Sequence, residues 1–143
     1  MNLDQKESIQ SSSLQSTLAL GWLVLLVLFL AIVLSQLMQA AIDDDFTRFS
    51  QHPGRNGWMS SSVLILVYGL MPLLTRLLDR RWFRWLNVVL LAAATAAMMK
   101  HQAQHMLEGM TYGLNGLVDV AHHAVGVVLV FLAIRWARVC KTV

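Results

Sequence analysis

The chain has 143 residues, of which 57% are hydrophobic and only 13% are charged, and its formal net charge is +3. This balance excludes a soluble globular domain, a disordered chain and a nucleic-acid binder, because too few polar groups are present to cover a water-exposed surface. The single cysteine, Cys140, excludes an internal disulfide and a thiolate metal cage. We therefore expect an integral membrane protein whose surface mainly contacts the lipid bilayer.

Hydropathy predicts an all-α membrane protein with four transmembrane helices in an antiparallel bundle. The predicted helices cover residues 14–42, 58–78, 83–108 and 114–138, which together form one transmembrane domain over residues 14–138. Each is long enough to cross a hydrocarbon layer that needs roughly 17 to 25 helical residues. Residues 1–13 are predicted to be a mobile N-terminal tail and residues 139–143 a C-terminal tail.

The first two helices carry sequence features that bear on where they begin and end. The first apolar segment is expected to be retained rather than cleaved as a signal peptide, because it is long and its exit at residues 37–41 offers no good cleavage site. Pro72, in the second segment, predicts either a kink or the cytoplasmic end of that helix.

The five tryptophans all fall near predicted boundaries between lipid and water. Tryptophan is enriched at such boundaries, where its ring lies among the lipid headgroups. The sequence therefore predicts interfacial anchors at Trp22, Trp58, Trp82, Trp85 and Trp136.

The distribution of basic residues predicts the orientation in the membrane. Eight of the 11 lie on one side, in the N-terminal tail, the second-to-third connection and the C-terminal tail; they are Lys6, Arg76, Arg80, Arg81, Arg84, Arg135, Arg138 and Lys141. The other side has only Arg48, Arg55 and Lys100. Because basic residues are retained on the cytoplasmic side during insertion, we expect both termini in the cytoplasm of a cell with a bacterial-type inner membrane.

One polar cluster stands out where the third and fourth helices meet at the outer side. On the third helix, His101, His105 and Glu108 share a face with two alanines, Ala94 and Ala97. On the fourth, a shared face holds Asp119, His122, His123, Gly126 and Ala133. The joining loop is short, so the two helices must be neighbours and these side chains should lie at similar depths.

Imidazoles spaced i and i+4, with carboxylates nearby, are typical of a transition-metal site. The predicted ligand set is His101, His105, Glu108, Asp119, His122 and His123. Imidazole nitrogen suits copper, zinc and iron, so the ligand types do not choose the ion. Ionisable groups are costly inside a membrane and usually functional there, but the same residues would also suit a solvated helical hairpin above the headgroups.

Three functions fit this pattern. The first is a small integral membrane protein that binds or handles a transition-metal ion at the outer face. The second is a non-catalytic accessory or assembly subunit of a larger membrane complex, and the third is a redox module that holds haem or a quinone between facing helices. The sequence has no phosphate-binding loop and no nucleophile motif, so a non-enzymatic role is favoured over an enzymatic one.

Overall fold

The computed structural model describes residues 3–42, 55–107 and 114–139, apart from the side chains of some helix residues, which include His101 and His105. All regular structure in these ranges is α-helical, with no strand. The helices are α1 (Leu3–Ile42), α3 (Arg55–Leu77), α4 (Arg81–Leu107) and α5 (Leu114–Arg138). The predicted all-α class is confirmed.

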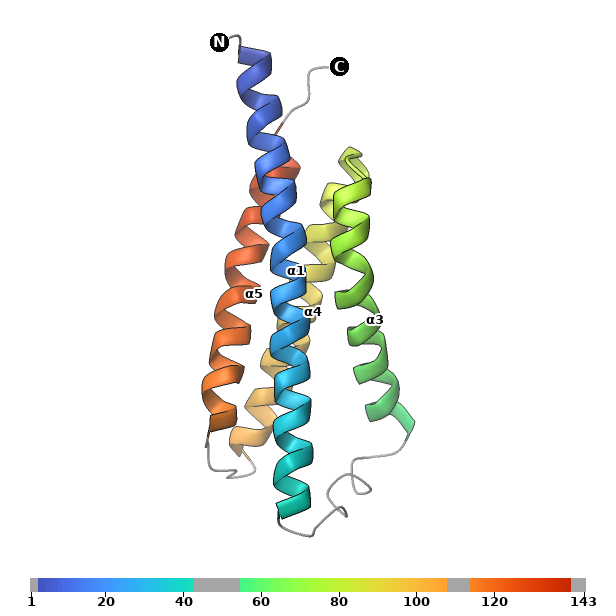
Figure 1. Ribbon diagram of the computed structural model, residues 1–143, viewed down its shortest axis with the longest axis vertical. Coiled ribbons are helices and arrows are strands. Elements are labelled where there is room, and N and C mark those ends of the chain that lie inside the picture. The colour runs from blue at the N-terminus through green and yellow to red at the C-terminus, as the bar shows by residue number, and fades with distance from the viewer. Residues whose placement is uncertain (1–2, 43–54, 108–113, 140–143) are drawn as a thin grey trace.

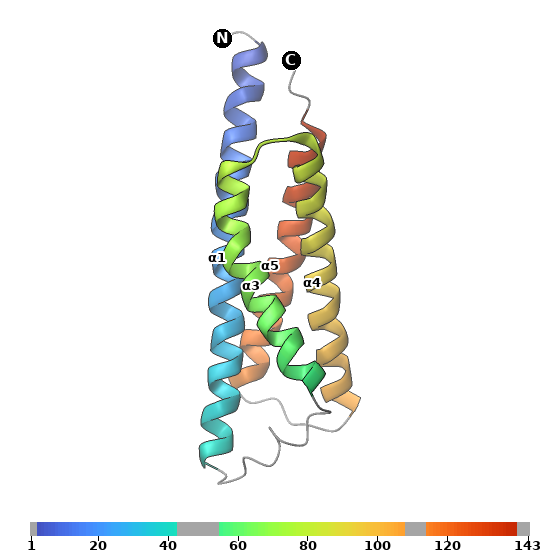
Figure 2. The same cartoon turned by 90° about the vertical axis from the view of Figure 1, so that its right-hand side faces the viewer.

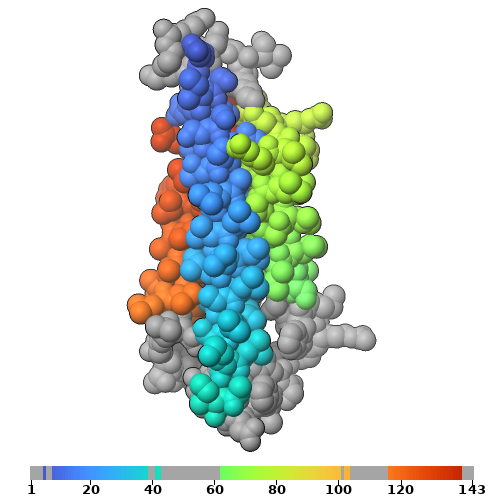
Figure 3. Space-filling view, viewed as in Figure 1, coloured from blue at the N-terminus to red at the C-terminus, as the bar shows by residue number. Residues whose placement is uncertain are grey.

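The four helices lie side by side along one long axis (Figure 1). Helix α1 packs against both α3 and α5, α4 packs mainly against α5, and α3 and α4 touch less. Both chain ends and the α3–α4 connection lie at the same end of the molecule, as Figure 1 and its 90° rotation in Figure 2 show. In the space-filling view, α1 runs over the front of the molecule between α3 and α5 (Figure 3).

Three of the helices contain segments long and apolar enough to cross a membrane. These segments are Ser8–Met38, Arg81–Lys100 and Gly116–Arg138. In α3 the apolar part within the described residues, Ser62–Leu77, is shorter. Large apolar side chains cover the outside of the bundle, among them Leu20, Leu66 and Phe131, each at least 60% exposed. Such a surface is suited to lipid contact.

The observed helix bounds differ from the predicted ones mainly at the N-terminus. Helix α1 begins at Leu3 and includes most of the segment predicted to be a mobile tail. Ser11, within that segment, is buried and accepts a hydrogen bond from Arg84. Helix α3 continues through Pro72 to Leu77, so this proline does not mark the helix end.

The core of the bundle holds two of the tryptophans that were predicted to be interfacial anchors. Trp22 and Trp136 are fully buried, so the prediction is wrong for both. The indole Nε1 of Trp22 donates to Asn87 Oδ1 over 2.8 Å, and the ring of Trp136 lies 5.3 Å from the Arg84 guanidinium carbon. Each therefore pairs with a buried polar group that hydropathy does not show. Trp82 and Trp85 are exposed, as an anchor requires.

Arg84 binds the ends of three helices together close to the chain termini. Its side chain is 4% exposed and forms an ion pair with Asp79, with Nη2 and Oδ1 2.7 Å apart. It also donates from Nη1 to the carbonyl oxygens of Trp136 and Val139, at 3.1 and 2.8 Å, and from Nη2 to Ser11 Oγ at 3.3 Å. The Trp136 carbonyl lies in the last turn of α5, where it also accepts from the Val139 N–H over 3.3 Å, and Val139 follows the end of the helix.

Asn87 links α1, α3 and α4 one turn further into the bundle. Its Oδ1 accepts hydrogen bonds from Trp22 and from Thr75 Oγ1, and its Nδ2 donates to the Phe83 carbonyl over 3.4 Å. On the same side, Gln15 Nε2 donates to the Thr75 carbonyl over 2.8 Å and so satisfies an acceptor in the last turn of α3. This end of the bundle is thus held by two sets of polar contacts, one around Arg84 and one around Asn87.

Candidate functional site

The six predicted metal ligands lie on two helices, and the structure describes the side chains of three of them. His101 and His105 belong to α4, but their side chains lie outside the described set, and Glu108 lies outside the described residues altogether. On α5, Asp119 and His123 are half-buried and His122 is buried, with 1% of its surface exposed. His122 therefore lies inside the bundle and not on a solvated hairpin.

The surroundings of His122 are aromatic. The ring centroids of His122 and Tyr68 are 5.9 Å apart, and the His122 and His123 centroids are also 5.9 Å apart, with their planes at 78°. Tyr68 in turn packs against Trp22 and Phe29, both with centroids 5.8 Å from its own. The His122 ring thus extends from α5 toward Tyr68 of α3, at the edge of the aromatic cluster that Tyr68 forms with Trp22 and Phe29.

Neither ring nitrogen of His122 has a hydrogen-bond partner among the described residues. A neutral imidazole carries one N–H donor and one lone-pair acceptor, and leaving such groups unpaired in a protein interior costs about 1–3 kcal/mol each. Native proteins pair nearly all buried polar groups. The described part of the bundle therefore buries the His122 ring without giving a hydrogen-bond partner to either of its nitrogens.

His123 is oriented by the backbone of its own helix. Its Nδ1 lies 2.6 Å from the carbonyl oxygen of Asp119, one turn earlier on α5. Because a carbonyl can only accept, this contact assigns the proton to Nδ1 and leaves Nε2 with the lone pair. The Nε2 atom is buried and has no partner among the described residues. This arrangement, with one nitrogen bound to a carbonyl and the other left basic, is the one that metal-binding histidines commonly show.

Two further buried polar atoms were not predicted from the sequence. The Tyr68 hydroxyl and the Gln102 Oε1 are both buried without a hydrogen-bond partner among the described residues. Tyr68 is a lone hydroxyl within the apolar run of residues 63–71, and Gln102 lies between two predicted ligands. Their positions in the sequence could have marked both residues as candidates. Only the packing of α3 against the bundle, however, shows that Tyr68 faces His122.

A close contact between α4 and α5 sets the relative depth of their residues. A Cβ atom added to Gly126 would lie 2.6 Å from Thr95 Oγ1, so the two backbones approach here because position 126 has no side chain. Ala94 and Ala133, which share the predicted faces of the polar cluster, are buried, whereas Ala97 is exposed. Toward the α4–α5 connection, position 101 is about 9 Å from Thr95 and His122 about 6 Å from Gly126 by helical rise.

The described side chains do not by themselves complete a metal site. Among them, no three histidine, cysteine, aspartate or glutamate side chains lie close enough together to hold an ion. They do provide an adjacent imidazole pair whose free nitrogens are shielded from solvent. Such a pair can act as two neutral nitrogen ligands or as hydrogen-bonding groups for a polar molecule.

Comparisons with protein-family models, with curated proteins and with solved structures find no match to this chain.

Proposed function

We propose that the four helices form an antiparallel bundle across a bacterial-type inner membrane, with both termini in the cytoplasm. Three helices have the required length and apolar composition, and α3 would provide the fourth crossing. The chain ends and the α3–α4 connection, which share one end of the molecule in Figure 1, carry most of the basic residues. Retention of basic residues in the cytoplasm would place that end inside the cell.

Cysteine labelling tests this orientation. In a Cys140→Ser background, Thr111→Cys should react with a membrane-impermeant maleimide added to intact spheroplasts. Cys140 in the unaltered chain should react only after the membrane is permeabilised. Labelling of position 111 solely after permeabilisation would reverse the topology.

We further propose that the protein binds a transition-metal ion at the outer side of the bundle, through His122 and His123. The observation that carries this proposal is the His123 ring, whose Nδ1 is held by the Asp119 carbonyl and whose buried Nε2 has no partner among the described residues. His122 adds a second imidazole, with a ring centroid 5.9 Å away. A bound ion would take the lone pairs that the protein leaves unpaired.

The remaining ligands are proposed to come from α4 and the adjoining loop. Buried positions on α4 repeat at Asn87, Leu91, Ala94 and Met98. Extending this helical period brings positions 101 and 105 to the same face. Glu108 and Asp119 would act as additional oxygen ligands or as acceptors that orient the imidazoles. Copper, zinc and iron all accept this donor set.

A bare ion fits the histidine pair better than haem or a quinone does. Within the described residues, a groove of α1 toward α3 and another toward α5 are both lined by residues other than His122 and His123. Haem ligation by these histidines would need space for a macrocycle beside a ring that already packs against Tyr68 and His123. An ion needs only the lone pairs.

Metal analysis of the detergent-purified protein tests the proposal. Protein from cells grown with copper, zinc and iron should contain about one ion per chain, and His123→Ala should lose it while still inserting in the membrane. The matched control is His52→Ala, which removes the one histidine outside the proposed ligand set. A visible spectrum of the same samples would reveal haem by its Soret band.

Each outcome of this measurement decides between the functions. Full metal content in His123→Ala would overturn the site assignment. A wild-type protein that contains neither an ion nor haem would overturn metal binding and favour the role of an accessory subunit in a larger membrane complex.

A further inference from the structure

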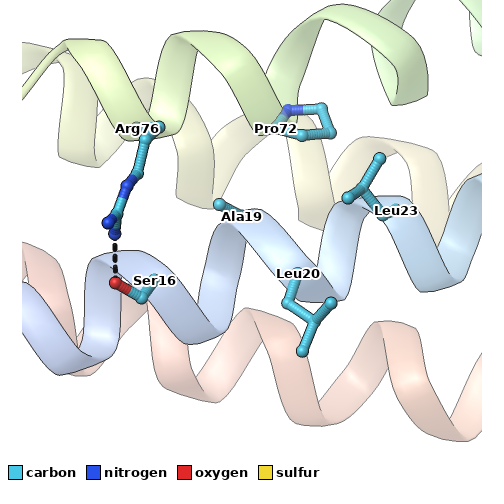
Figure 4. A pocket seen from close by; sticks show the side chains of 6 residues that line it. All are labelled: Ser16, Ala19, Leu20, Leu23, Pro72 and Arg76. Atoms are coloured by element: carbon cyan, nitrogen blue, oxygen red, sulfur yellow. Dashed lines mark hydrogen bonds between the residues drawn. The ribbon is translucent and has the colours of Figure 1, made fainter.

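A groove on the outer surface of the bundle has an arginine at one end and mostly apolar side chains along the rest of its length. It has a volume of about 350 Å³ and lies between α1 and α3. Figure 4 shows its lining: Ser16, Ala19, Leu20 and Leu23 from α1, and Pro72 and Arg76 from α3. The groove is separate from the histidine site.

The two ends of the groove differ in polarity. Arg76, in the last turn of α3, reaches across one end and donates from Nη1 to Ser16 Oγ (Figure 4). Pro72 lies one helical turn back on α3, and Leu23 lies about 10 Å along α1 from Ser16 by helical rise. The lining beyond Arg76 is almost entirely hydrocarbon. The groove thus runs along the helices from a cation into the apolar zone of the bundle.

The hollow exists because of the residues at its floor. Ala19 has the smallest side chain of the lining, and Pro72 is buried, while Leu20 and Leu23 stand at its side with 63% and 45% of their surface exposed. Gln15, one residue before Ser16, donates to the carbonyl oxygens of Thr75 and Arg76 and fixes α1 against the end of α3. The groove is therefore a feature of the helix packing and not of a single rotamer.

The polar end of the groove carries the positive charge of Arg76, which is accessible to a ligand. A guanidinium has five N–H donors, and the contact with Ser16 uses one, while the Arg76 side chain is exposed. Arg80, in the α3–α4 connection, and Arg81, the first residue of α4, are also exposed. The nearby Asp79 carboxylate is engaged by Arg84. Arginine binds phosphate oxygens through parallel N–H donors.

We propose that this groove is a binding site for an anionic phospholipid, with its phosphate on Arg76 and the first part of one acyl chain along Ala19 and Pro72. The order of polarity matches that of a lipid, whose phosphate lies at the membrane interface and whose chain runs toward the bilayer centre. A soluble phosphate compound would match only the arginine end. The match holds whichever leaflet contains this end of the bundle.

Native mass spectrometry of the whole protein tests the site. The protein in neutral detergent is mixed with equal amounts of phosphatidylglycerol and phosphatidylcholine that have the same acyl chains. Wild type should retain phosphatidylglycerol preferentially, and Arg76→Gln should reduce that preference about tenfold, the size expected for one charge-assisted contact. The control is Arg138→Gln, which removes an exposed arginine of α5 at the same end and should keep the preference.

A second variant tests the apolar half of the groove. Ala19→Leu keeps Arg76 but fills the floor, so it should also lose the preference. Glycerol phosphate, which has the headgroup charge without chains, should not compete. Any one of four results would overturn the proposal. These are an equal preference in wild type and Arg76→Gln, an equal loss of preference in Arg138→Gln, a retained preference in Ala19→Leu, and competition by glycerol phosphate. Circular dichroism of every variant tests whether the helices are intact. If Arg76→Gln does not fold, Arg76→Lys takes its place. This variant keeps the charge and should retain part of the preference for phosphatidylglycerol.

Discussion

Two buried polar regions lie along the same bundle, and they differ in how their atoms are paired. In the first region, Arg84 and Asn87 use protein carbonyls, a carboxylate and hydroxyls as partners. In the second, His122, His123 and Tyr68 contain buried polar atoms without partners among the described residues. In the first region the Trp136 indole N–H also has no partner within the described ranges, and its ring lies against the Arg84 guanidinium.

This difference distinguishes a structural network from a candidate binding site. A buried polar group that is fully paired stabilises the fold, whereas one left unpaired lowers stability by about 1–3 kcal/mol and needs another reason to be present. Binding of an ion or polar molecule supplies such a reason, because the ligand provides the missing partners. The two regions should therefore respond to mutation in opposite ways.

The largest expected effect is at Arg84. Arg84→Met should lower the free energy of unfolding by about 3 kcal/mol, because it removes the buried ion pair with Asp79 and the guanidinium donors to the carbonyls of Trp136 and Val139. Unfolding of the purified protein by increasing sodium dodecyl sulfate in mixed micelles measures this loss. Arg138→Met, an exposed arginine, should change stability by no more than about 0.5 kcal/mol. Equal effects of the two substitutions would show that the Arg84 network does not hold the helix ends.

A smaller effect is expected at the contact between α4 and α5. Gly126→Ala should cost about 2 kcal/mol, because the new Cβ would meet Thr95 Oγ1 at 2.6 Å. Thr95→Ala removes the two nearest atoms and leaves only its Cβ, at 3.4 Å, so the double variant should recover most of the loss. Gly69→Ala is the matched control, because nothing lies within 4 Å of its added Cβ. The same unfolding assay compares all four proteins, and a double variant no more stable than Gly126→Ala would rule out Thr95 as the obstacle.

Much of the helical architecture could be predicted from hydropathy, because a membrane requires long unbroken apolar runs and these are visible in one sequence. The start of α1 was not predictable in this way. Its first turns are polar, and Ser11 becomes part of the bundle only through Arg84, which lies 73 residues further along the chain. Trp22 and Trp136 were misplaced for the same reason, since their polar partners come from other helices.

The candidate site was predictable as a group of residue types but not as a set of contacts. Helical periodicity placed His122 and Gly126 on one inward face, and both are buried. It could not show that Tyr68 of α3 packs against His122, because α3 is connected to α5 only through α4. Nor could it show that the backbone carbonyl of Asp119 orients His123.

The smallest expected effect, and the sharpest test of the comparison, is at His122 in protein freed of metal with a chelator. His122→Leu should leave the free energy of unfolding unchanged or raise it by about 1 kcal/mol, because it removes two buried nitrogens that have no partner in the described part of the chain. Asn87→Leu, a similar polar-to-apolar change at another fully buried position, should lower it by about 2 kcal/mol, because Trp22 and Thr75 lose their acceptor. Both are measured by the same detergent titration. If His122→Leu destabilised the metal-free protein as much as Asn87→Leu, His122 would be a paired structural residue, and the contrast between the two regions would disappear. If it is neutral without metal but removes the added stability that a bound ion gives to wild type, the histidine region is kept for binding and not for folding.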